Sequence, residues 1–351
     1  MKFLLFGALS LLLFSCDNNV NRDDLLPNAS GKHGEIFILT ENQIWDGEIG
    51  EMVRTRLAKK AKGPYLRPEP TYYFSHTTPK NLNHINQLRR NMLRIMIDRD
   101  SAYTETKVEL KPNYFAKNQL LVILKDSDEE RLYNYVKNNF DEIVDIFEAN
   151  EIKQLGQIYR SEANRNIKAR TEEMYGISIA LPKKMEFKYE KDGFMLIKRD
   201  RSSSFMANES TNADGGTFWI QQGFMFWAEP YKDESQLTVQ GVLNNRDSVL
   251  KANIPGRLSG TYMGTEYDEY YKPESKVFRY NGHYTIEVRG LWKYKGESFI
   301  GGGGPFVQYT ILNETRNLVI TVCGYVYAPK FNKRDYIREI DAILNTIELV
   351  N

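Results

Sequence analysis

Residues 306–328 read FVQYTILNETRNLVITVCGYVYA and contain the clearest structural signal in the chain. Two runs rich in β-branched and aromatic residues, 306–312 and 318–327, flank a short polar segment at 313–317. Such runs on either side of a turn segment are typical of two paired strands. We therefore expect an antiparallel β-hairpin here and look for the rest of its sheet in the flanking sequence.

Further strands are expected on the N-terminal side of this hairpin. Asn281-Gly282 is the strongest short-range signal for a hairpin turn in the chain. The other expected elements are strands at 185–190, 194–200, 217–228, 261–271, 276–280 and 283–294, a polar loop at 201–216 and a helix at 236–250. The chain closes with an amphipathic helix, and Asn332 is its expected cap. Residues 176–351 are therefore predicted to form a curved antiparallel sheet with packed helices.

Residues 35–175 show a different pattern, in which helical segments alternate with short apolar strands. The expected strands are 35–40, 71–76, 92–97 and 119–124, and the expected helices are 47–62, 81–90 and a long helical region from residue 127 to about 174. Ser127 with Glu130 three residues later matches a capping box at the start of that region. We therefore expect an N-terminal α+β domain, so that the whole chain is of the α+β class with two α+β layers.

The first sixteen residues, MKFLLFGALSLLLFSC, carry one positive charge at Lys2 followed by an apolar segment. The segment is shorter than the roughly 20 residues of a transmembrane helix and has the length of the hydrophobic region of a signal peptide. The stretch Leu13-Phe14-Ser15-Cys16 is similar to the lipobox of bacterial lipoproteins. This resemblance implies that residues 1–15 are a signal peptide and that Cys16 is lipidated at the new N-terminus.

Residues 16–34 are polar and are expected to form a flexible tether between the lipid and the folded body. Several acyl chains on Cys16 would anchor the protein firmly to the membrane. Lipoproteins exported to the surface of some Gram-negative cells carry an acidic run after this cysteine, and here only Asp17 is acidic in that position. We therefore expect an outer-membrane lipoprotein whose body faces the periplasm.

Charge and cysteine content exclude several classes of protein. Lys plus Arg number 47 and Asp plus Glu 46, so the net charge of +1 gives no general attraction to nucleic acid, and no nucleic-acid partner is expected. Hydrophobic residues at 41% and charged residues at 26% are ordinary for a globular protein and exclude wholesale disorder. If Cys16 is lipidated, Cys323 has no disulfide partner, and its apolar surroundings predict a buried thiol.

No motif is typical of catalysis. The chain has no Gly-x-Ser-x-Gly motif, and its four histidines lack the spacing of a helical metal site. The sequence therefore predicts no catalytic residue, metal site or cofactor. Gly301 to Gly304 are not followed by the Lys-Ser or Lys-Thr pair of a phosphate loop, and we expect them to form a flexible loop between strands.

Aromatic side chains are the best candidates for ligand binding. Trp219 and Trp227 lie in an aromatic-rich strand, whose residues are equally typical of a core strand. Tyr267, Tyr270 and Tyr271 lie in a carboxylate-rich segment, GTEYDEYY. Separately, Ser101 and Ser248 each follow an aspartate and precede an apolar residue, a pattern used for periplasmic O-glycosylation in one bacterial phylum.

Two longer phrases carry a family resemblance. Residues 176–187, GISIALPKKMEF, and residues 192–200, DGFMLIKRD, together with the lipobox, the tether and the helix-rich first half, resemble domain of unknown function 4837, a family of bacterial envelope lipoproteins. The resemblance covers nearly the whole mature chain and implies an envelope location without an assigned activity. The order of elements over residues 177–350 is also similar to the photosystem PsbP-like sandwich.

Three functions agree with these features. The first is a non-catalytic lipoprotein that acts through protein contacts in the cell envelope. The second is a carbohydrate- or small-ligand-binding lipoprotein that uses exposed aromatic side chains. The third is a hydrolase whose carboxylates come together from distant positions. A large exposed apolar patch would favour a protein partner, exposed rings a ligand, and converging carboxylates a hydrolase.

Overall fold

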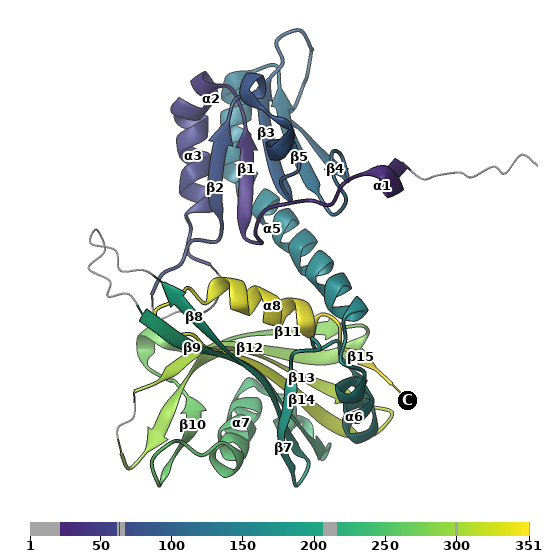
Figure 1. Ribbon diagram of the computed structural model, residues 1–351, viewed down its shortest axis with the longest axis vertical. Coiled ribbons are helices and arrows are strands. Elements are labelled where there is room, and N and C mark those ends of the chain that lie inside the picture. Colours follow the sequence, from purple (N-terminus) through teal and green to yellow (C-terminus); the bar gives the residue numbers. More distant parts are fainter. Residues whose placement is uncertain (1–21, 62, 64–66, 206–215, 299–300, 351) are drawn as a thin grey trace, which may run out of the picture.

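The computed structural model describes residues 22–61, 63, 67–205, 216–298 and 301–350. The predicted signal peptide, Cys16 and the first part of the tether lie outside the described residues. The rest folds into two α+β domains joined by one long helix, α5 (Glu129–Ser161), as predicted for the fold class (Figure 1). Within the described residues, no helix has both the length and the apolar character needed to cross a membrane.

The N-terminal domain is built on a five-stranded sheet in the order β2-β1-β3-β5-β4. Strand β4 is antiparallel to β5, and the other pairings are parallel. The elements are α1 (Arg22–Leu25), β1 (Glu35–Leu39), α2 (Asn42–Asp46), α3 (Glu48–Leu57), β2 (Tyr73–Thr77), the 3-10 helix η1 (Pro79–Asn81), α4 (His84–Gln87), β3 (Asn91–Ile97), β4 (Lys107–Pro112) and β5 (Leu120–Asp126). Strand β4 was not predicted, because its sequence KVELKP is largely polar.

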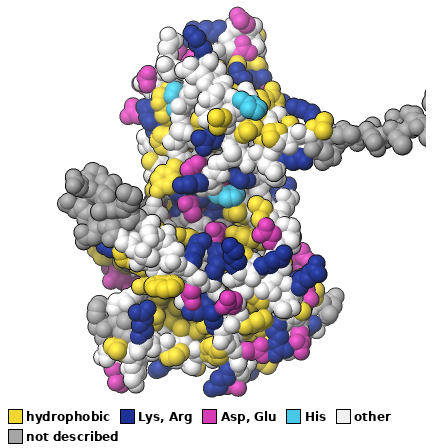
Figure 2. Space-filling model, viewed as in Figure 1, with side chains coloured by type: hydrophobic (Ala, Val, Ile, Leu, Met, Phe, Trp, Pro, Cys, Tyr) yellow, Lys and Arg dark blue, Asp and Glu magenta, His cyan; other side chains and the backbone are white. Residues whose placement is uncertain are grey.

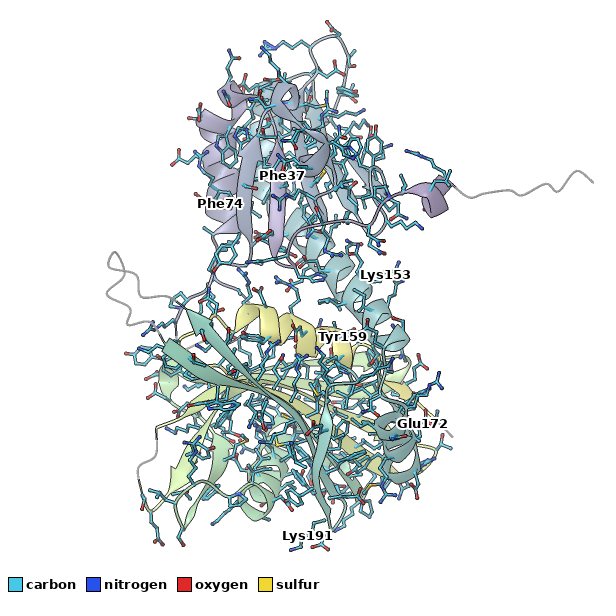
Figure 3. The ribbon with its side chains drawn as sticks, viewed as in Figure 1. Phe37, Phe74, Lys153, Tyr159, Glu172 and Lys191 are labelled. Carbon is cyan, nitrogen blue, oxygen red and sulfur yellow. The ribbon has the colours of Figure 1, made fainter. Side chains whose placement is uncertain are left out.

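Helix α3 and the first half of α5 cover one face of this sheet. Their apolar stripes meet the sheet in a core that includes Val53, Val122 and Phe140, each at most 1% exposed. Helix α5 then continues beyond the sheet to the C-terminal domain, where Tyr159 packs against the second core near α8 (Figure 3). Because 33 residues of α-helix span about 50 Å, one element belongs to both domains.

The predicted tether is shorter than expected. Residues 27–34 run along the edge of the N-terminal domain, where the Ala29 amide donates to the Lys117 carbonyl at 2.9 Å and the Ser30 amide to the Leu88 carbonyl at 2.7 Å. The boundary predicted at residue 34 is therefore wrong, because these backbone groups find partners on the domain. Only the segment before α1 is left to connect Cys16 to the body.

The C-terminal domain is a curled antiparallel sheet in the order β10-β12-β13-β14-β9-β8-β7, with β11 on the same edge of β12 as β10. Its elements are α6 (Arg165–Tyr175), β6 (Ile177–Ser178), β7 (Glu186–Lys191), β8 (Phe194–Phe205), β9 (Gly216–Pro230), η3 (Glu234–Leu237), α7 (Val239–Asn253), β10 (Thr261–Thr265), η4 (Glu269–Tyr271), β11 (Glu274–Tyr280), β12 (His283–Gly296), β13 (Gly303–Asn313), β14 (Leu318–Tyr327), α8 (Arg334–Leu344) and β15 (Glu348–Leu349). Strand β15 pairs with β6 in a separate small sheet.

Both predicted hairpins of this sheet are confirmed. Strands β13 and β14 pair in antiparallel register and lie at the centre of the sheet. Asn281 and Gly282 have φ values of +48° and +88°, which fit a type I′ turn between β11 and β12. The loop predicted at 201–216 is shorter, because β8 continues to Phe205 and β9 starts at Gly216; residues 206–215 lie outside the described residues.

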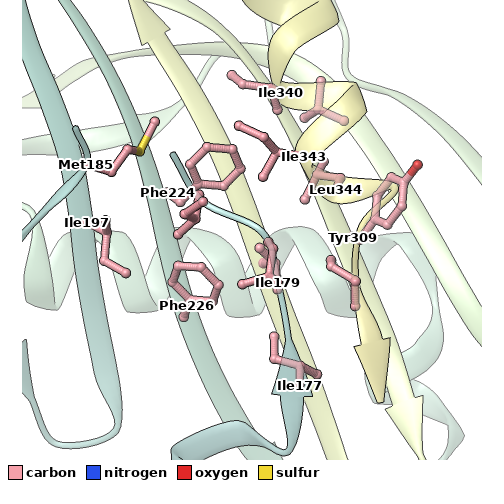
Figure 4. Close-up of a cluster of buried hydrophobic side chains, with 14 of the residues drawn as sticks. Ile177, Ile179, Met185, Ile197, Phe224, Phe226, Tyr309, Ile340, Ile343 and Leu344 are labelled. Carbon is pink, nitrogen blue, oxygen red and sulfur yellow. The ribbon is translucent and has the colours of Figure 1, made fainter. Parts of the chain in front are cut away.

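Helices cover the two faces of the curled sheet, with α8 on the side of the N-terminal domain and α7 on the opposite side (Figure 1). On the α8 side, Ile340, Ile343 and Leu344 pack against Phe224 and Tyr309 of the sheet, together with residues around β6 (Figure 4). On the α7 side, a separate core of the C-terminal domain forms around buried residues of the same strands. The central strands are therefore buried on both faces, which explains the nearly continuous apolar runs in β13 and β14.

The domain boundary predicted at residue 175 is displaced. Helix α6 buries Ile167 and Tyr175 in the core of the C-terminal domain, and the Tyr175 hydroxyl donates to the Gly193 carbonyl at 3.0 Å. The break therefore falls between the end of α5 at Ser161 and the start of α6 at Arg165. Helical pattern continues across this break, which is why the sequence alone placed the boundary one helix too late.

Two predicted helix caps are wrong. Asp128, not Ser127, caps α5 by accepting the Arg131 amide at 2.7 Å. Helix α8 receives no cap from Asn332, whose side-chain amide donates to the Tyr73 hydroxyl. Instead, the Glu69 carboxylate, from the segment between α3 and β2, accepts the amides of Lys333 and Arg334 at 2.9 and 2.7 Å. A long-range contact thus replaces the local one.

Candidate functional site: a cleft at the rim of the curled sheet

A cleft of about 550 Å³ opens where β12 ends and β13 begins. We call it the rim cleft. Residues 327–333, which lead from β14 into α8, form its second wall, and Arg67 and Glu69 reach it from the segment between α3 and β2. Both domains therefore contribute to one site. Its remaining lining residues are Glu266, Leu291, Trp292, Lys293, Tyr294 and Gly301 to Gly304.

The glycine run shapes the rim cleft. Gly303 and Gly304 belong to β13, so the flexible loop predicted for residues 301–304 is wrong for its second half. A Cβ on Gly304 would lie 2.0 Å from the Val326 carbonyl oxygen, and Gly302 has a φ of +144° that other residues rarely adopt. Close backbone packing therefore requires glycine here, and within the run only at Gly301 would a Cβ meet nothing within 4 Å.

Aromatic side chains form the floor of the rim cleft. Trp292 is 2% exposed, and its indole N–H donates to the Val326 carbonyl at 3.0 Å. The ring of Tyr294 packs edge-on against it at 5.5 Å, and the ring of Tyr327 lies tilted at 6.2 Å. Burial raises the pKa of the Tyr294 hydroxyl, so this group stays neutral at physiological pH. The floor is rigid and apolar, with hydroxyl groups as its polar points.

The charge of the lining is positive, with four cationic and two anionic side chains. Glu266 is paired with Lys293 at 2.5 Å, and Glu69 is occupied by the amides at the start of α8. Burial lowers the pKa of the Lys333 ammonium; Glu69 opposes this effect and Arg67 adds to it. With both carboxylates engaged, Arg67, Lys330 and Lys333 give the cleft an excess of positive charge.

The predicted aromatic candidates do not come together. Trp219 is 68% exposed on β9, and Tyr270 is 88% exposed on η4. Tyr267 donates to the Asp247 carboxylate at 2.8 Å, and Tyr271 is half-buried at the end of η4. The three tyrosines follow Glu266 in the chain, yet they do not line the rim cleft.

The prediction of Trp227 as an exposed ligand-binding residue is wrong. Trp227 is 4% exposed in the core under α7, and its indole N–H donates to the Asn245 side chain at 2.7 Å. Trp219 and Trp227 lie eight residues apart on the same strand, so they share a face by alternation. Helix α7 covers that face only around Trp227. This long-range packing buries Trp227 and leaves Trp219 exposed.

The two glycosylation candidates lie in different surroundings. Ser248 is exposed on α7. Ser101 is half-buried, and its hydroxyl donates to the Asp98 carboxylate at 2.6 Å. O-glycosylation of the two serines stays a prediction. The hydroxyl of Ser248 is the more accessible of the two.

Cys323 is buried, as predicted, and faces an unusual neighbour. Its sulfur lies 2.9 Å from the guanidinium of Arg246, which is itself fully buried beneath the ring of Phe306. Burial raises the pKa of the Cys323 thiol, while Arg246 opposes this effect. The described residues contain no group of three or more His, Cys, Asp or Glu that could hold a metal ion.

Sequence reasoning missed Trp292, Tyr294, Tyr327 and Lys333, the residues that make the rim cleft. They lie on β12, at the end of β14 and in the connection to α8, so no local motif joins them. The glycine run at 301–304 was the available signal, because a run of glycines next to strands indicates a close approach of backbone as well as a loop.

Comparisons with known proteins give a family and distant structural relatives. No curated protein matches this sequence. The crystal structure of the Ran-binding protein Mog1p of Saccharomyces cerevisiae is similar at 10% identity, with a TM-score of 0.32, over 50% of this chain and 91% of that chain. The solution structure of cyanobacterial PsbP (CyanoP) of Synechocystis sp. PCC 6803 is similar at 8% identity, with a TM-score of 0.25, over 47% and 92%.

Two family profiles divide the chain at the end of α5. Residues 29–160 are similar to a Domain of unknown function (DUF8532), and residues 164–346 match a Domain of unknown function (DUF4837). The second match covers only the C-terminal domain. The sequence resemblance had implied coverage of nearly the whole mature chain. The second match covers more than half of the residues, and the chain belongs to the DUF4837 family.

Proposed function

We propose that this protein is a non-catalytic lipoprotein of the bacterial envelope that is anchored through Cys16 and binds an organic anion in the rim cleft. The observation that carries the binding proposal is the combination of an aromatic floor with an excess of positive charge in one cleft of about 550 Å³. Small-molecule sites commonly measure about 300–1,000 Å³ and combine apolar walls with a few polar groups. The anchor rests on the lipobox-like sequence that ends at Cys16.

The chemistry of the lining supports an anion with an apolar body. The faces of Tyr294 and Tyr327 would contact an aromatic or aliphatic group, and the glycine run leaves room for it. Lys330 and Lys333 lie in the opposite wall and would pair with a carboxylate, sulfonate or phosphate. A ligand of this kind would use both features at once.

The carboxylates of the cleft favour binding over hydrolysis. Burial alone would raise the pKa of Glu266, but hydrogen bonds from Lys293 and from the amides of Asp268 and Tyr267 outweigh this effect and lower it. A general acid needs the opposite shift. Glu69 already accepts backbone amides through both oxygens, which leaves it poorly placed to transfer a proton.

The binding proposal is tested with naphthalene-2-sulfonate as an anionic aromatic probe and naphthalene-2-methanol as its neutral counterpart. The purified full-length lipoprotein is titrated by calorimetry in detergent micelles, with protein-free micelles as the blank. We expect the sulfonate to bind more tightly than the alcohol, and Lys330→Glu combined with Lys333→Glu to weaken its binding at least tenfold, equivalent to about 1.4 kcal/mol.

Lys191→Glu is the matched control, because Lys191 lies at the tip of the β7–β8 hairpin, far from the rim cleft (Figure 3). It changes the net charge in the same direction and should leave binding unchanged. The absence of sulfonate binding, or equal binding by the double variant, would contradict the proposal.

The anchor is tested separately by metabolic labelling with an alkyne fatty acid. The wild-type chain should take up the label and float with membranes, whereas Cys16→Ser should do neither. Label on the Cys16→Ser protein would remove the basis for placing the chain in the envelope through this residue.

Protein contacts are the second candidate function, favoured by the strong exposure of Trp219 and Tyr270. Large exposed aromatic rings are frequent anchors of protein interfaces. Chemical crosslinking in intact cells tests this candidate. A discrete crosslinked species that disappears with Trp219→Ser or Tyr270→Ser would support it, and an unchanged pattern with both variants would count against it.

A further inference from the structure

Three apolar side chains stand out of the N-terminal domain near the point where the chain leaves towards Cys16. Leu25 of α1 is 74% exposed, Ile85 of α4 is 71% exposed, and Tyr114, after β4, is 41% exposed. Single exposed apolar side chains are common on protein surfaces. Their position around one exit point is the feature that needs a cause.

Hydrogen bonds place these three segments side by side. Helix α1 joins the segment after β4 through the Arg22 guanidinium, which donates to the Tyr114 carbonyl at 3.3 Å, and through Asp23, which accepts the Asn113 amide at 2.8 Å. That segment joins the end of α4 through the Gln119 side-chain amide, which donates to the Gln87 carbonyl at 2.6 Å. Helix α1, the segment after β4 and the end of α4, which carry Leu25, Tyr114 and Ile85, therefore lie next to one another.

Cations accompany the apolar side chains. Arg22 and Lys117 lie on the same segments as Leu25 and Tyr114, and Lys80 is exposed on η1 shortly before α4. Figure 2 shows hydrophobic and Lys or Arg side chains mixed around the exit of the N-terminal chain. Helix α1 also carries Asp23 and Asp24, and the Asp23 carboxylate accepts the Asn113 side-chain amide. An edge with this composition complements a surface that is negatively charged outside and apolar beneath.

The chain length before α1 limits where this edge can lie. Five residues lie between Cys16 and Arg22, and a fully extended chain spans at most about 3.6 Å per residue. Lipid on Cys16 would therefore keep α1 within about 20 Å of the bilayer surface. The short tether therefore keeps this edge of the domain near the membrane, within reach of the lipid headgroups.

We propose that this edge, which we call the tether edge (Leu25, Ile85, Tyr114, Arg22 and Lys117), docks on the bilayer that holds the lipidated Cys16. The apolar side chains enter the headgroup region and the cations contact anionic headgroups. The proposal rests on the anchoring of Cys16 in the proposed function. It orients the body with the tether edge on the membrane, and the hairpin tip at Lys191 lies at the far end of the C-terminal domain (Figure 3).

Depth-dependent quenching tests this orientation on the full-length lipoprotein. Ile85→Cys, Tyr114→Cys and, as control, Lys191→Cys are labelled with an NBD dye; the other thiols are the acylated Cys16 and the buried Cys323. The proteins are reconstituted in vesicles of phosphatidylethanolamine and phosphatidylglycerol with doxyl-labelled lipid. We expect NBD at positions 85 and 114 to be quenched at least about twofold more than at position 191, because interfacial groups lie about 5–10 Å deep.

Each outcome is informative. Equal quenching at all three positions on protein that floats with the vesicles would overturn the docking proposal while the anchor stands. A second copy or a partner protein on the tether edge would also leave positions 85 and 114 unquenched by lipid. Protein that does not float would overturn the anchor, and with it the docking.

A charge variant sharpens the test. Arg22→Glu combined with Lys117→Glu should reduce quenching at position 85 towards the value at position 191, while flotation through the lipid persists. Unchanged quenching in this variant would contradict a role of the cations. Lys276→Glu, at an exposed position of β11, is the matched charge control and should have no effect.

Discussion

The two sheets of this protein differ in the space that is left at the ends of their strands. In the N-terminal domain, side chains fill the space around the parallel strands, and a hollow beside β1 and β3 measures only about 10 Å³. In the C-terminal domain, a cleft of about 550 Å³ opens beside the glycines that start β13, over an aromatic floor. The candidate site therefore lies where glycines let the backbones of β12, β13 and β14 approach closely, within the same α+β class as the N-terminal domain.

The two domains also depend on each other. Glu151 of α5 is fully buried and accepts the Gly34 amide and the Asn91 side-chain amide, each at 2.8 Å. The Arg338 guanidinium of α8 lies 3.1 Å away on its other side. Burial would raise the pKa of Glu151, but His33 and Arg338 outweigh it, so this carboxylate stays ionised. One charged group thus joins the segment before β1, the parallel sheet and helix α8.

The largest expected effect comes from removing that group. Glu151→Ala should lower the free energy of unfolding by about 3–5 kcal/mol, because it leaves the buried Arg338 with only the half-exposed Asp335 as a charge partner. Urea denaturation followed by circular dichroism measures this loss. Glu129→Ala, at an exposed position of the same helix, should cost less than about 1 kcal/mol. Equal effects of the two variants would contradict a structural junction at Glu151.

The glycine run should give the next largest effect. Gly304→Ala should cost about 3 kcal/mol, because its Cβ would meet the Val326 carbonyl oxygen and backbone must move. Gly301→Ala is the matched control, since nothing lies within 4 Å of a Cβ there, and should change stability by less than about 0.5 kcal/mol. Thermal unfolding compares the two. A tolerated Gly304→Ala would mean that close packing does not require the glycine.

A smaller effect, dependent on pH, is expected in the N-terminal domain. Burial would raise the pKa of Asp126, but hydrogen bonds from Arg131, Thr106 and the Asp128 amide lower it to about 2. A carboxyl whose pKa is lower in the folded state stabilises the fold above its unfolded pKa and loses this contribution as the pH falls. Asp126→Asn should therefore cost about 2 kcal/mol at pH 7, and the difference from wild type should shrink between about pH 4 and pH 2.

Urea titrations at pH 7, 4 and 2.5 measure this trend, with Asp192→Asn at an exposed hairpin tip as the control. A difference between wild type and Asp126→Asn that stays constant with pH would contradict the ionised, hydrogen-bonded state of Asp126.

Local signals in the sequence predicted the local structure well. Asn281-Gly282 forms its turn because only neighbouring residues decide it, and the apolar runs at 306–327 form the central hairpin because β-branched and aromatic residues favour a covered sheet. The buried state of Cys323 followed from the same apolar run. The α+β class of both domains could be read from the alternation of these elements.

Features that depend on distant partners could not be predicted. Asn332 has the right residue type for a cap, but Glu69 arrives from another domain and takes its place. Trp227 and Trp219 look alike in the sequence, and only the position of α7 buries one of them. The rim cleft is missed for the same reason, because its walls come from segments that the sheet and α8 bring together.

The most direct test of the account is a crystal structure of the protein with naphthalene-2-sulfonate. The account predicts the ring system in the rim cleft, over the glycine run and against Tyr294 and Tyr327, with the sulfonate near Lys333. A probe bound elsewhere on the molecule, with the rim cleft free of it at saturating concentration, would contradict the account.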